Sequence, residues 1–172
     1  MLDSIIHWIY CLPIGQAVLL ALLISGGLLT LHYQSAHKKW WKPFGVTLLI
    51  GWVLVVLAHT VLNRGVELRP WVKLEPFQTY IEVFNGGEIE LLRSAFMNVL
   101  LFYPGGLLLL MMFPKWKIRF VLPGFILVSI GIEACQYLFQ LGFVELDDVL
   151  HNTMGAMLGI AVIKLYQKLP RD

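Results

Sequence analysis

The chain has 172 residues, of which 58% are hydrophobic and only 14% are charged, and its formal net charge is +2. Soluble globular domains contain close to half apolar and about a quarter charged residues, so this composition excludes an ordinary water-soluble protein and predicts a membrane protein. The length predicts a single domain, residues 1–172.

Long apolar stretches divide the chain into membrane spans. A helix needs about 20 mainly apolar residues to cross the bilayer core. Five stretches meet this requirement, approximately residues 11–31, 44–62, 94–113, 118–141 and 148–165. The sequence therefore predicts an all-α, polytopic bundle of about five transmembrane helices.

The long connection of about residues 63–93 is not a low-complexity linker. It contains aromatic and apolar residues, and Asn85-Gly86-Gly87 is a turn signal. We expect an ordered outer loop that includes a short amphipathic segment on the membrane surface.

The charges predict the orientation of the spans. Nine of the 13 basic residues fall into three segments on one predicted side: Lys38, Lys39 and Lys42; Lys115, Lys117 and Arg119; Lys164, Lys168 and Arg171. Ten of the 11 acidic residues fall on the other side or in the outer halves of spans. Cytoplasmic loops are enriched in Lys and Arg. We therefore expect a multi-pass protein of the cell membrane with its N-terminus outside and its C-terminus in the cytoplasm.

This topology brings polar residues from four spans to one level near the extracytoplasmic side. Several are spaced by four residues and so share a helix face, as Asp148 and Asn152 do. The predicted ligand-binding residues are His59, Asn98, Ser129, Glu133, Gln136, Asp147, Asp148 and Asn152.

Glu133 needs an explanation because a carboxylate near the bilayer centre costs about 2.5 kcal/mol or more. One interpretation is that Glu133 hydrogen-bonds Asn152, Ser94 or His59 and holds helices together. The other is that these groups line a cavity open to the outer leaflet, which binds a polar head group. In that case Glu133 and Asp148 are the candidate catalytic residues, because buried carboxyl groups can transfer protons.

The remaining motifs point to packing. Gly155 and Gly159 form a GxxxG pattern, which permits close approach of two helices. Pro104-Gly105-Gly106 predicts a bend that exposes backbone carbonyls in the third span, a structural kink in the favoured interpretation and a binding feature in the alternative one. The His, Asp and Glu residues show no metal-site spacing such as HExxH, so we expect no metal and no cofactor.

Four motifs, in order along the chain, resemble those of the VanZ-like family of bacterial membrane proteins. They are Leu74-Glu75-Pro76-Phe77 (NL-x-PF in the family), Asn98 through Gly106 (N-x-x-x-F-x-P-x-G), Ser129 through Gln136 (S-x-x-x-E-x-x-Q) and Asp147 through Gly155 (D-D-V-x-x-N-T-x-G). Together they cover roughly half of the chain. The resemblance implies a cell-envelope role and a connection with resistance to teicoplanin, a lipoglycopeptide that acts outside the membrane.

The chain departs from the family pattern at two positions. Family members often carry Arg in the loop before the Asp pair, whereas this loop reads Leu141-Gly142-Phe143-Val144-Glu145. Position 73, usually Asn, is Lys73. If the family Arg binds an anionic ligand, this protein has another ligand or uses Arg93 or Lys73 instead.

Three classes of function fit these observations. The favoured class is a binding protein for a lipid-linked or amphiphilic ligand at the outer leaflet, with membrane lipids and an envelope precursor or lipoglycopeptide as partners. The alternative is an intramembrane hydrolase or transferase that acts on a lipid head group, although no nucleophile motif is present. The third is a structural subunit of an envelope complex. No nucleic-acid partner is expected, and the sequence does not specify the oligomeric state.

Overall fold

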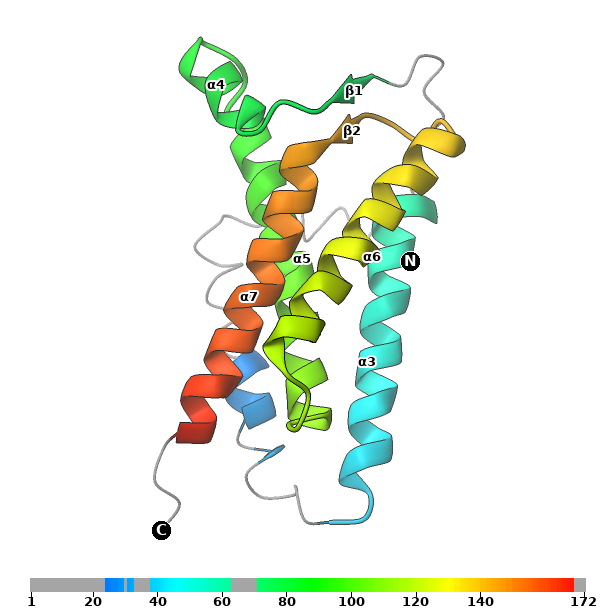
Figure 1. Ribbon diagram of the computed structural model, residues 1–172, viewed down its shortest axis with the longest axis vertical. Coiled ribbons are helices and arrows are strands. Elements are labelled where there is room, and N and C mark those ends of the chain that lie inside the picture. Colours follow the sequence, from blue (N-terminus) through cyan, green and yellow to red (C-terminus); the bar gives the residue numbers. More distant parts are fainter. Residues whose placement is uncertain (1–23, 30, 33–37, 63–70, 169–172) are drawn as a thin grey trace.

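In the computed structural model, residues 24–29, 31–32, 38–62 and 71–168 are described. Figure 1 shows an elongated bundle built from helix α3 (Trp41–Leu57), which continues into the π-helix η1 (Ala58–Leu62), and from α5 (Glu90–Met112), α6 (Ile118–Leu138) and α7 (Leu146–Lys168). Within the described ranges, four helices are long and apolar enough to cross a membrane. The predicted all-α bundle is therefore confirmed, while five spans and the N-out orientation stay predictions.

The helix bounds differ from the predicted spans by a few residues. Most of the predicted first span, residues 11–31, lies outside the described residues, and residues 24–29 and 31–32 of that region are helical. Helix α6 ends at Leu138 rather than at residue 141. Gln140 has a φ of 54°, and the backbone N–H of Leu141 donates to the carbonyl of Gln136 at 2.8 Å. This left-handed turn satisfies the last carbonyls and ends the helix.

Helices α5 and α7 form the tightest interface of the bundle, because glycines let their backbones touch. A Cβ on Gly155 would overlap the carbonyl oxygen of Val99, and a Cβ on Gly159 would overlap that of Tyr103. From α5, a Cβ on Gly106 would overlap the carbonyl oxygen of Ala156. The GxxxG pattern thus serves close packing, as predicted. Fully buried Phe102, Leu110 and Ile163 fill the core beside this interface.

The Pro104-Gly105-Gly106 segment stays inside the continuous helix α5. Gly105 leaves room for the Trp52 side chain of α3, since a Cβ there would overlap the indole ring. The indole N–H of Trp52 donates to the carbonyl of Leu101 at 2.8 Å. Gly105 thus lets the indole approach α5, and the bond from Trp52 to Leu101 fixes α3 against this segment.

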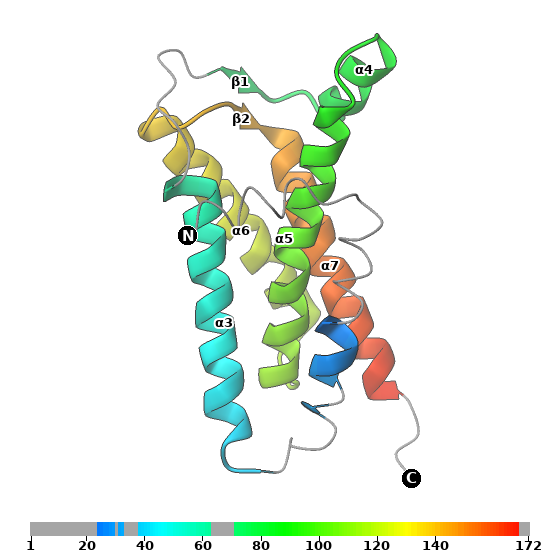
Figure 2. The same cartoon turned by 180° about the vertical axis from the view of Figure 1, so that it is seen from behind.

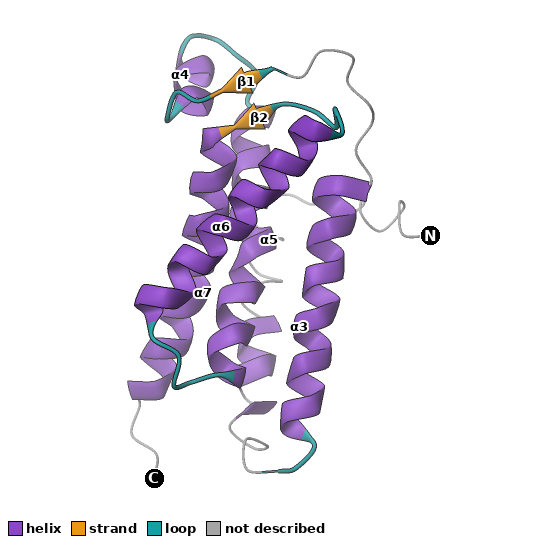
Figure 3. Ribbon diagram, turned by 45° about the vertical axis from the view of Figure 1, so that its right-hand side comes forward, coloured by secondary structure: helices purple, strands orange, loops and turns teal. Residues whose placement is uncertain are grey.

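A small cap covers one end of the bundle, as Figures 1 and 3 show. It consists of residues 71–89 and contains β1 (Val72–Lys73) and the short helix α4 (Gln78–Phe84). Strand β1 pairs in parallel with β2 (Val144–Glu145), with Val72 opposite Val144 and Lys73 opposite Glu145. The described part of the predicted outer loop is therefore folded onto the segment between α6 and α7.

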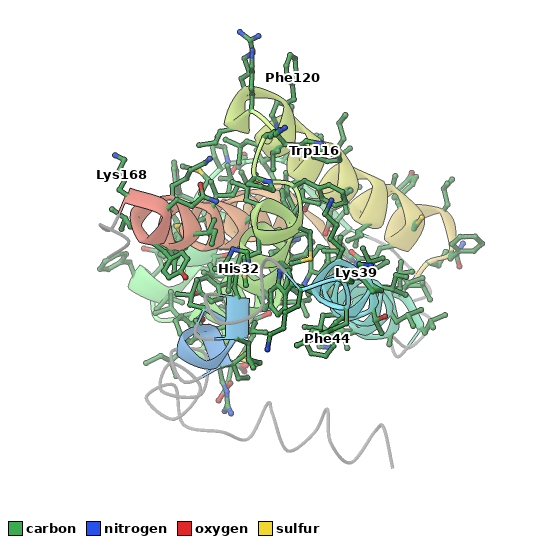
Figure 4. All side chains as sticks on the ribbon, turned by 90° about the horizontal axis from the view of Figure 1, so that it is seen from below. His32, Lys39, Phe44, Trp116, Phe120 and Lys168 are labelled. Carbon is green, nitrogen blue, oxygen red and sulfur yellow. The ribbon has the colours of Figure 1, made fainter. Side chains whose placement is uncertain are left out.

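The described basic residues of the three predicted cytoplasmic segments gather at the opposite end of the bundle. This end is formed by the start of α3, the connection from α5 to α6 and the end of α7, seen from below in Figure 4. The acidic residues Glu82, Glu145, Asp147 and Asp148 lie at the cap end. The two ends thus differ in charge, and the positive-inside rule assigns the cap to the extracytoplasmic side as a prediction.

Candidate functional site

Asp147, in the first turn of α7, holds the cap in place. Its side chain is only 2% exposed. Its Oδ1 accepts the backbone N–H of Phe77 at 2.6 Å, and its Oδ2 accepts that of Thr79 at 2.8 Å. The first N–H groups of a helix have no partner within the helix, and a carboxylate satisfies them and complements the helix dipole. Asp147 therefore caps α4 from a different helix, which gives it a structural role.

Asp148, the next residue, lies in the wall of a cavity. Its Oδ1 accepts a hydrogen bond from Nδ2 of Asn98 at 2.7 Å, which joins α7 to α5. The cavity has a volume of about 190 Å³ and is lined by Thr79, Leu91, Ser94, Ala95, Phe143, Glu145 and Asp148. It lies between the cap, the start of α5 and the start of α7. Of the two predicted catalytic residues, Asp148 is the one that lines this cavity.

Glu133 of α6 binds backbone instead. Its Oε2 accepts the N–H of Glu145 at 3.1 Å, and its side chain is buried. This bond fixes β2 against α6, and β2 in turn carries Glu145 into the cavity wall. Glu133 therefore shapes the cavity through Glu145, which is closer to the helix-holding interpretation than to the catalytic one.

A second polar layer lies deeper in the bundle and consists of amides and hydroxyls. Nδ2 of Asn152 donates to Oγ of Ser129 at 2.8 Å, joining α7 to α6. Nε2 of Gln136 donates to the carbonyl of Thr60 at 2.9 Å, joining α6 to η1. That carbonyl is within the last residues of η1, where intrahelical donors run out. These predicted residues thus connect three helices in pairs.

Some polar atoms in this layer have no protein partner among the described residues. They are Oε1 of Gln136 and Oδ1 of Asn152, and Nδ1 of His151, next to Asn152 on α7, is a third such atom; all three side chains are buried. Buried polar groups in proteins are normally hydrogen-bonded, and exceptions concentrate where water, an ion or a ligand binds. The layer below the cavity therefore has spare hydrogen-bonding capacity.

His59 is the predicted residue that the structure places least clearly in the site. It is half-buried in η1, next to Thr60, and it is not among the residues that line the cavity. No group of three or more His, Cys, Asp or Glu side chains in the described part of the chain is arranged to bind a metal.

Sequence reasoning missed the residues that the cap contributes. Thr79 lines the cavity, and the hydroxyl of Tyr80 lies 2.9 Å from Nε2 of His151. The available signal was the spacing of Asp147 and His151, which are four residues apart on α7 and therefore share a helix face. No sequence pattern identified α4 as the partner of that face.

Lys73 of the cap forms ion pairs with two carboxylates. Nζ of Lys73 donates to Oε1 of Glu82 at 3.0 Å and lies 3.5 Å from Oε1 of Glu145. The hydrogen bond to Glu82 raises the pKa of Lys73, and the same bond lowers the pKa of Glu82, with a further contribution from Gln78. Lys73 is therefore engaged by two carboxylates.

Arg93, the other cation considered for an anionic ligand, lies near a carboxylate of its own helix. Its Nη1 is 3.6 Å from Oε1 of Glu90, one turn earlier on α5. Neither cation is among the cavity-lining residues. The residues that line the cavity therefore include two acidic residues and two with hydroxyl groups, and no cation.

Comparison with known proteins adds an independent finding. A family model described as VanZ/LLP1 matches residues 44–167, which is most of the chain and includes the cap, the cavity and the deeper polar layer. The chain is 28% identical over 156 residues to "Protein VanZ" from Enterococcus faecium, an alignment that covers 85% of this chain and 77% of that protein. No solved structure matches the chain.

Proposed function

This chain belongs to the VanZ/LLP1 family, and we propose that it is a multi-pass protein of the cell membrane that binds an amphiphilic ligand at the outer leaflet. The observation that carries the proposal is the cavity beside Asp148, which lies under the cap at the acidic end of the bundle. A binding site needs a concave surface with a few fixed polar groups. Asp148 is such a group, because Asn98 holds its carboxylate in place.

The charge of the cavity indicates the chemistry of the ligand. Its polar lining residues are Asp148, Glu145, Ser94 and Thr79, and no Lys, Arg or His is among them. Binding sites are electrostatically complementary to their ligands. The bound group is therefore a hydrogen-bond donor, an amine, amide or hydroxyl, rather than a phosphate. Amides and hydroxyls are plentiful in the polar parts of lipid-linked envelope precursors and lipoglycopeptides.

Exposed apolar side chains around the cap suit a site at the membrane surface. Trp71, Phe77 and Phe84 are all more than half exposed, and Phe84 reaches 89%. Aromatic residues concentrate where the bilayer meets water. With the cap at the boundary between bilayer and water, an amphiphile can keep its apolar part in the lipid while its polar part enters the cavity.

The family resemblance supplies the biological context of the proposal, which is reduced susceptibility to teicoplanin. The test is to express the full chain in a teicoplanin-susceptible bacterium and to measure the minimal inhibitory concentration of teicoplanin. We expect wild type to raise this value and Asp148→Asn to return it to the level of the empty vector. Glu88→Gln, an exposed carboxylate outside the cavity, is the matched control and keeps the wild-type effect.

Binding is tested separately with the purified chain in lipid nanodiscs, titrated with teicoplanin and with a lipid-linked peptidoglycan precursor. Saturable binding that Asp148→Asn abolishes supports the proposal. If Asp148→Asn reaches the membrane in normal amounts and still gives full resistance and binding, the cavity is not the site.

The enzymatic alternative has less support in the geometry. A hydrolase or transferase needs an acid and a base at the reacting atoms. Glu133, the proposed partner of Asp148 in that role, accepts a backbone N–H and does not line the cavity. Glu145 does line the cavity, so an enzymatic function would require Asp148 and Glu145 as the acid and base. Turnover of the lipid-linked precursor in the same nanodiscs would favour it.

A further inference from the structure

A second, larger hollow lies toward the basic end of the bundle, far from the cavity under the cap. It is a groove of about 800 Å³, and its lining comes from α3, α5, α6 and the connection between α5 and α6. Its walls are apolar, with Trp52 and Val53 on α3, Leu109 on α5, and Phe125 and Val128 on α6. The volume is within the range of about 300–1,000 Å³ that is usual for small-molecule sites. We refer to it as the basic-end groove.

The groove exists because α3 and α6 are held to different partners. Trp52 fixes α3 to α5 through its bond to the Leu101 carbonyl. Helix α6 packs on α7 and meets η1 at the cap end, where Gln136 bonds to Thr60. Below this point the two helices diverge, as Figure 3 shows. The Trp52 ring, 6.0 Å from that of Phe125, is where the two walls come together.

Positive charge gathers at the mouth of the groove. Lys115 and Lys117 both line it, and Trp116 between them is 52% exposed. Lys117 is also the N-cap residue of α6, where the helix dipole adds partial positive charge. No acidic residue is among the described residues that line the groove. An apolar channel below two lysines and an interfacial tryptophan is complementary to a lipid with an anionic head group.

We propose that the basic-end groove holds one anionic glycerophospholipid, with an acyl chain between α3 and α6 and its phosphate at Lys115 and Lys117. This site is separate from the ligand site under the cap, and it does not depend on the function proposed for that site. The predicted side is the cytoplasmic leaflet, where anionic lipids contribute a negative surface potential.

Two other occupants fit the observations less well. The first is the first predicted span of this chain. Its described part lies on the α7 side of α5, as Figure 2 shows, where Ser25 hydrogen-bonds Tyr103 at 2.7 Å. A second copy of the chain in a two-fold dimer would bring the same surface of both subunits together. The two lysine pairs would then face each other, which like-charge repulsion opposes.

The test is native mass spectrometry of the full chain, released from detergent after incubation with phosphatidylglycerol or phosphatidylcholine of identical acyl chains. We expect wild type to retain phosphatidylglycerol in preference to phosphatidylcholine. Each lysine near a membrane surface contributes about fivefold to the binding of anionic lipid. The double variant Lys115→Gln/Lys117→Gln therefore loses most of the preference, whereas Lys168→Gln, at the end of α7 and away from Trp116 in Figure 4, keeps it.

A second pair of variants tests the groove itself. A Cβ added to Gly124, which lines the groove, meets nothing within 4 Å, so Gly124→Phe places a ring in the groove without a clash at Cβ. Gly131, on the same helix, also has open space and does not line the groove, so Gly131→Phe is the matched control. We expect Gly124→Phe to lose retention of both lipids and Gly131→Phe to behave as wild type. Circular dichroism checks that both variants fold.

Three results would overturn the proposal. Wild type would retain the two lipids equally, or Gly124→Phe would retain them as well as Gly131→Phe does, or a wild-type dimer would appear and be lost in Gly124→Phe. The last result would assign the groove to a second copy of the chain. If Gly124→Phe does not fold, the lysine variants decide the question, because their side chains are exposed.

Discussion

The carboxylate of Asp148 accepts a hydrogen bond from the side-chain amide of Asn98 across the interface of α7 and α5, with 2.7 Å between Oδ1 and Nδ2. The register that brings them together is set one residue further along α5 and two turns further along α7, where Gly155 lies against the Val99 carbonyl. Close backbone packing thus positions the one predicted catalytic residue that lines the cavity.

The first prediction concerns this pair. A hydrogen bond to a charged group contributes about 1.5–3 kcal/mol. We expect Asn98→Ala and Asp148→Ala each to lower the free energy of unfolding in detergent, and the double variant to lower it by less than their sum. The coupling energy from the double-mutant cycle measures the bond. Strictly additive effects would show that Asn98 does not hold Asp148.

The second prediction concerns Asp147, whose two carboxylate oxygens hold the backbone of Phe77 and Thr79. Asp147→Asn removes the charge and one of the two acceptors, so α4 should open more often while the four long helices stay intact. We expect amide hydrogen exchange in residues 77–84 to accelerate by about tenfold or more, which corresponds to a loss of about 1.5 kcal/mol. Glu88→Gln is the control, and unchanged protection of α4 in Asp147→Asn would contradict the capping role.

The third prediction is a pH dependence of the cap, which follows from Lys73 and Glu82. The pKa of Glu82 lies below the ordinary value of 4.5 for a glutamate, so its contribution is complete above that pH and is lost as the pH falls through the lowered pKa. The pKa of Lys73 lies above 10.5, so its contribution is complete below that pH and is lost as the pH rises through the raised pKa. Both side chains are about one third exposed, so the effect stays below about 1 kcal/mol.

A spin label at exposed position 84, introduced as Phe84→Cys after Cys11 and Cys135 are replaced by Ser, reports this transition. We expect label mobility to rise at acidic pH below about 4.5 and Glu82→Gln to show the mobile state already at neutral pH. If Glu82→Gln leaves the pH dependence of label mobility unchanged, the ion pair between Lys73 and Glu82 does not stabilise the cap.

The fourth prediction concerns the glycines of the α5–α7 interface. A Cβ on Gly155 meets backbone, which cannot move aside as a flexible side chain can. Overpacking of this kind costs about 1–3 kcal/mol. We expect Gly155→Ala to lower the thermal unfolding temperature clearly. Gly51→Ala, with nothing within 4 Å of the added Cβ, should not lower stability, because Ala favours a helix over Gly. Equal stability of the two variants would contradict the observed packing.

Sequence reasoning recovered the helices because their signal is local. Apolar stretches of bilayer length located α3, α5, α6 and α7 to within a few residues, and the ordered motifs identified the family. Helix direction predicted polar residues at one level, whereas the structure divides them between the cavity wall and a deeper layer. Their partners were not predictable: Glu133 bonds the backbone of Glu145, and Gln136 bonds the carbonyl of Thr60. Backbone groups are the same at every residue, so no side-chain pattern reveals them as partners.

The sequence by itself determined that the chain is a bundle of apolar helices with acidic residues toward one end and basic residues at the other. Only the tertiary structure decided what Asp147 and Asp148 do, although they are adjacent. Neighbouring residues on a helix point about 100° apart, so Asp147 meets the backbone of the cap while Asp148 meets Asn98 and the cavity. The partners of Asp147 and Asp148 depend on two features. One is the pairing of β1 with β2, segments about 70 residues apart, and the other is the close approach of the helices that glycines allow. These are contacts between distant parts of the chain, and local sequence does not encode them.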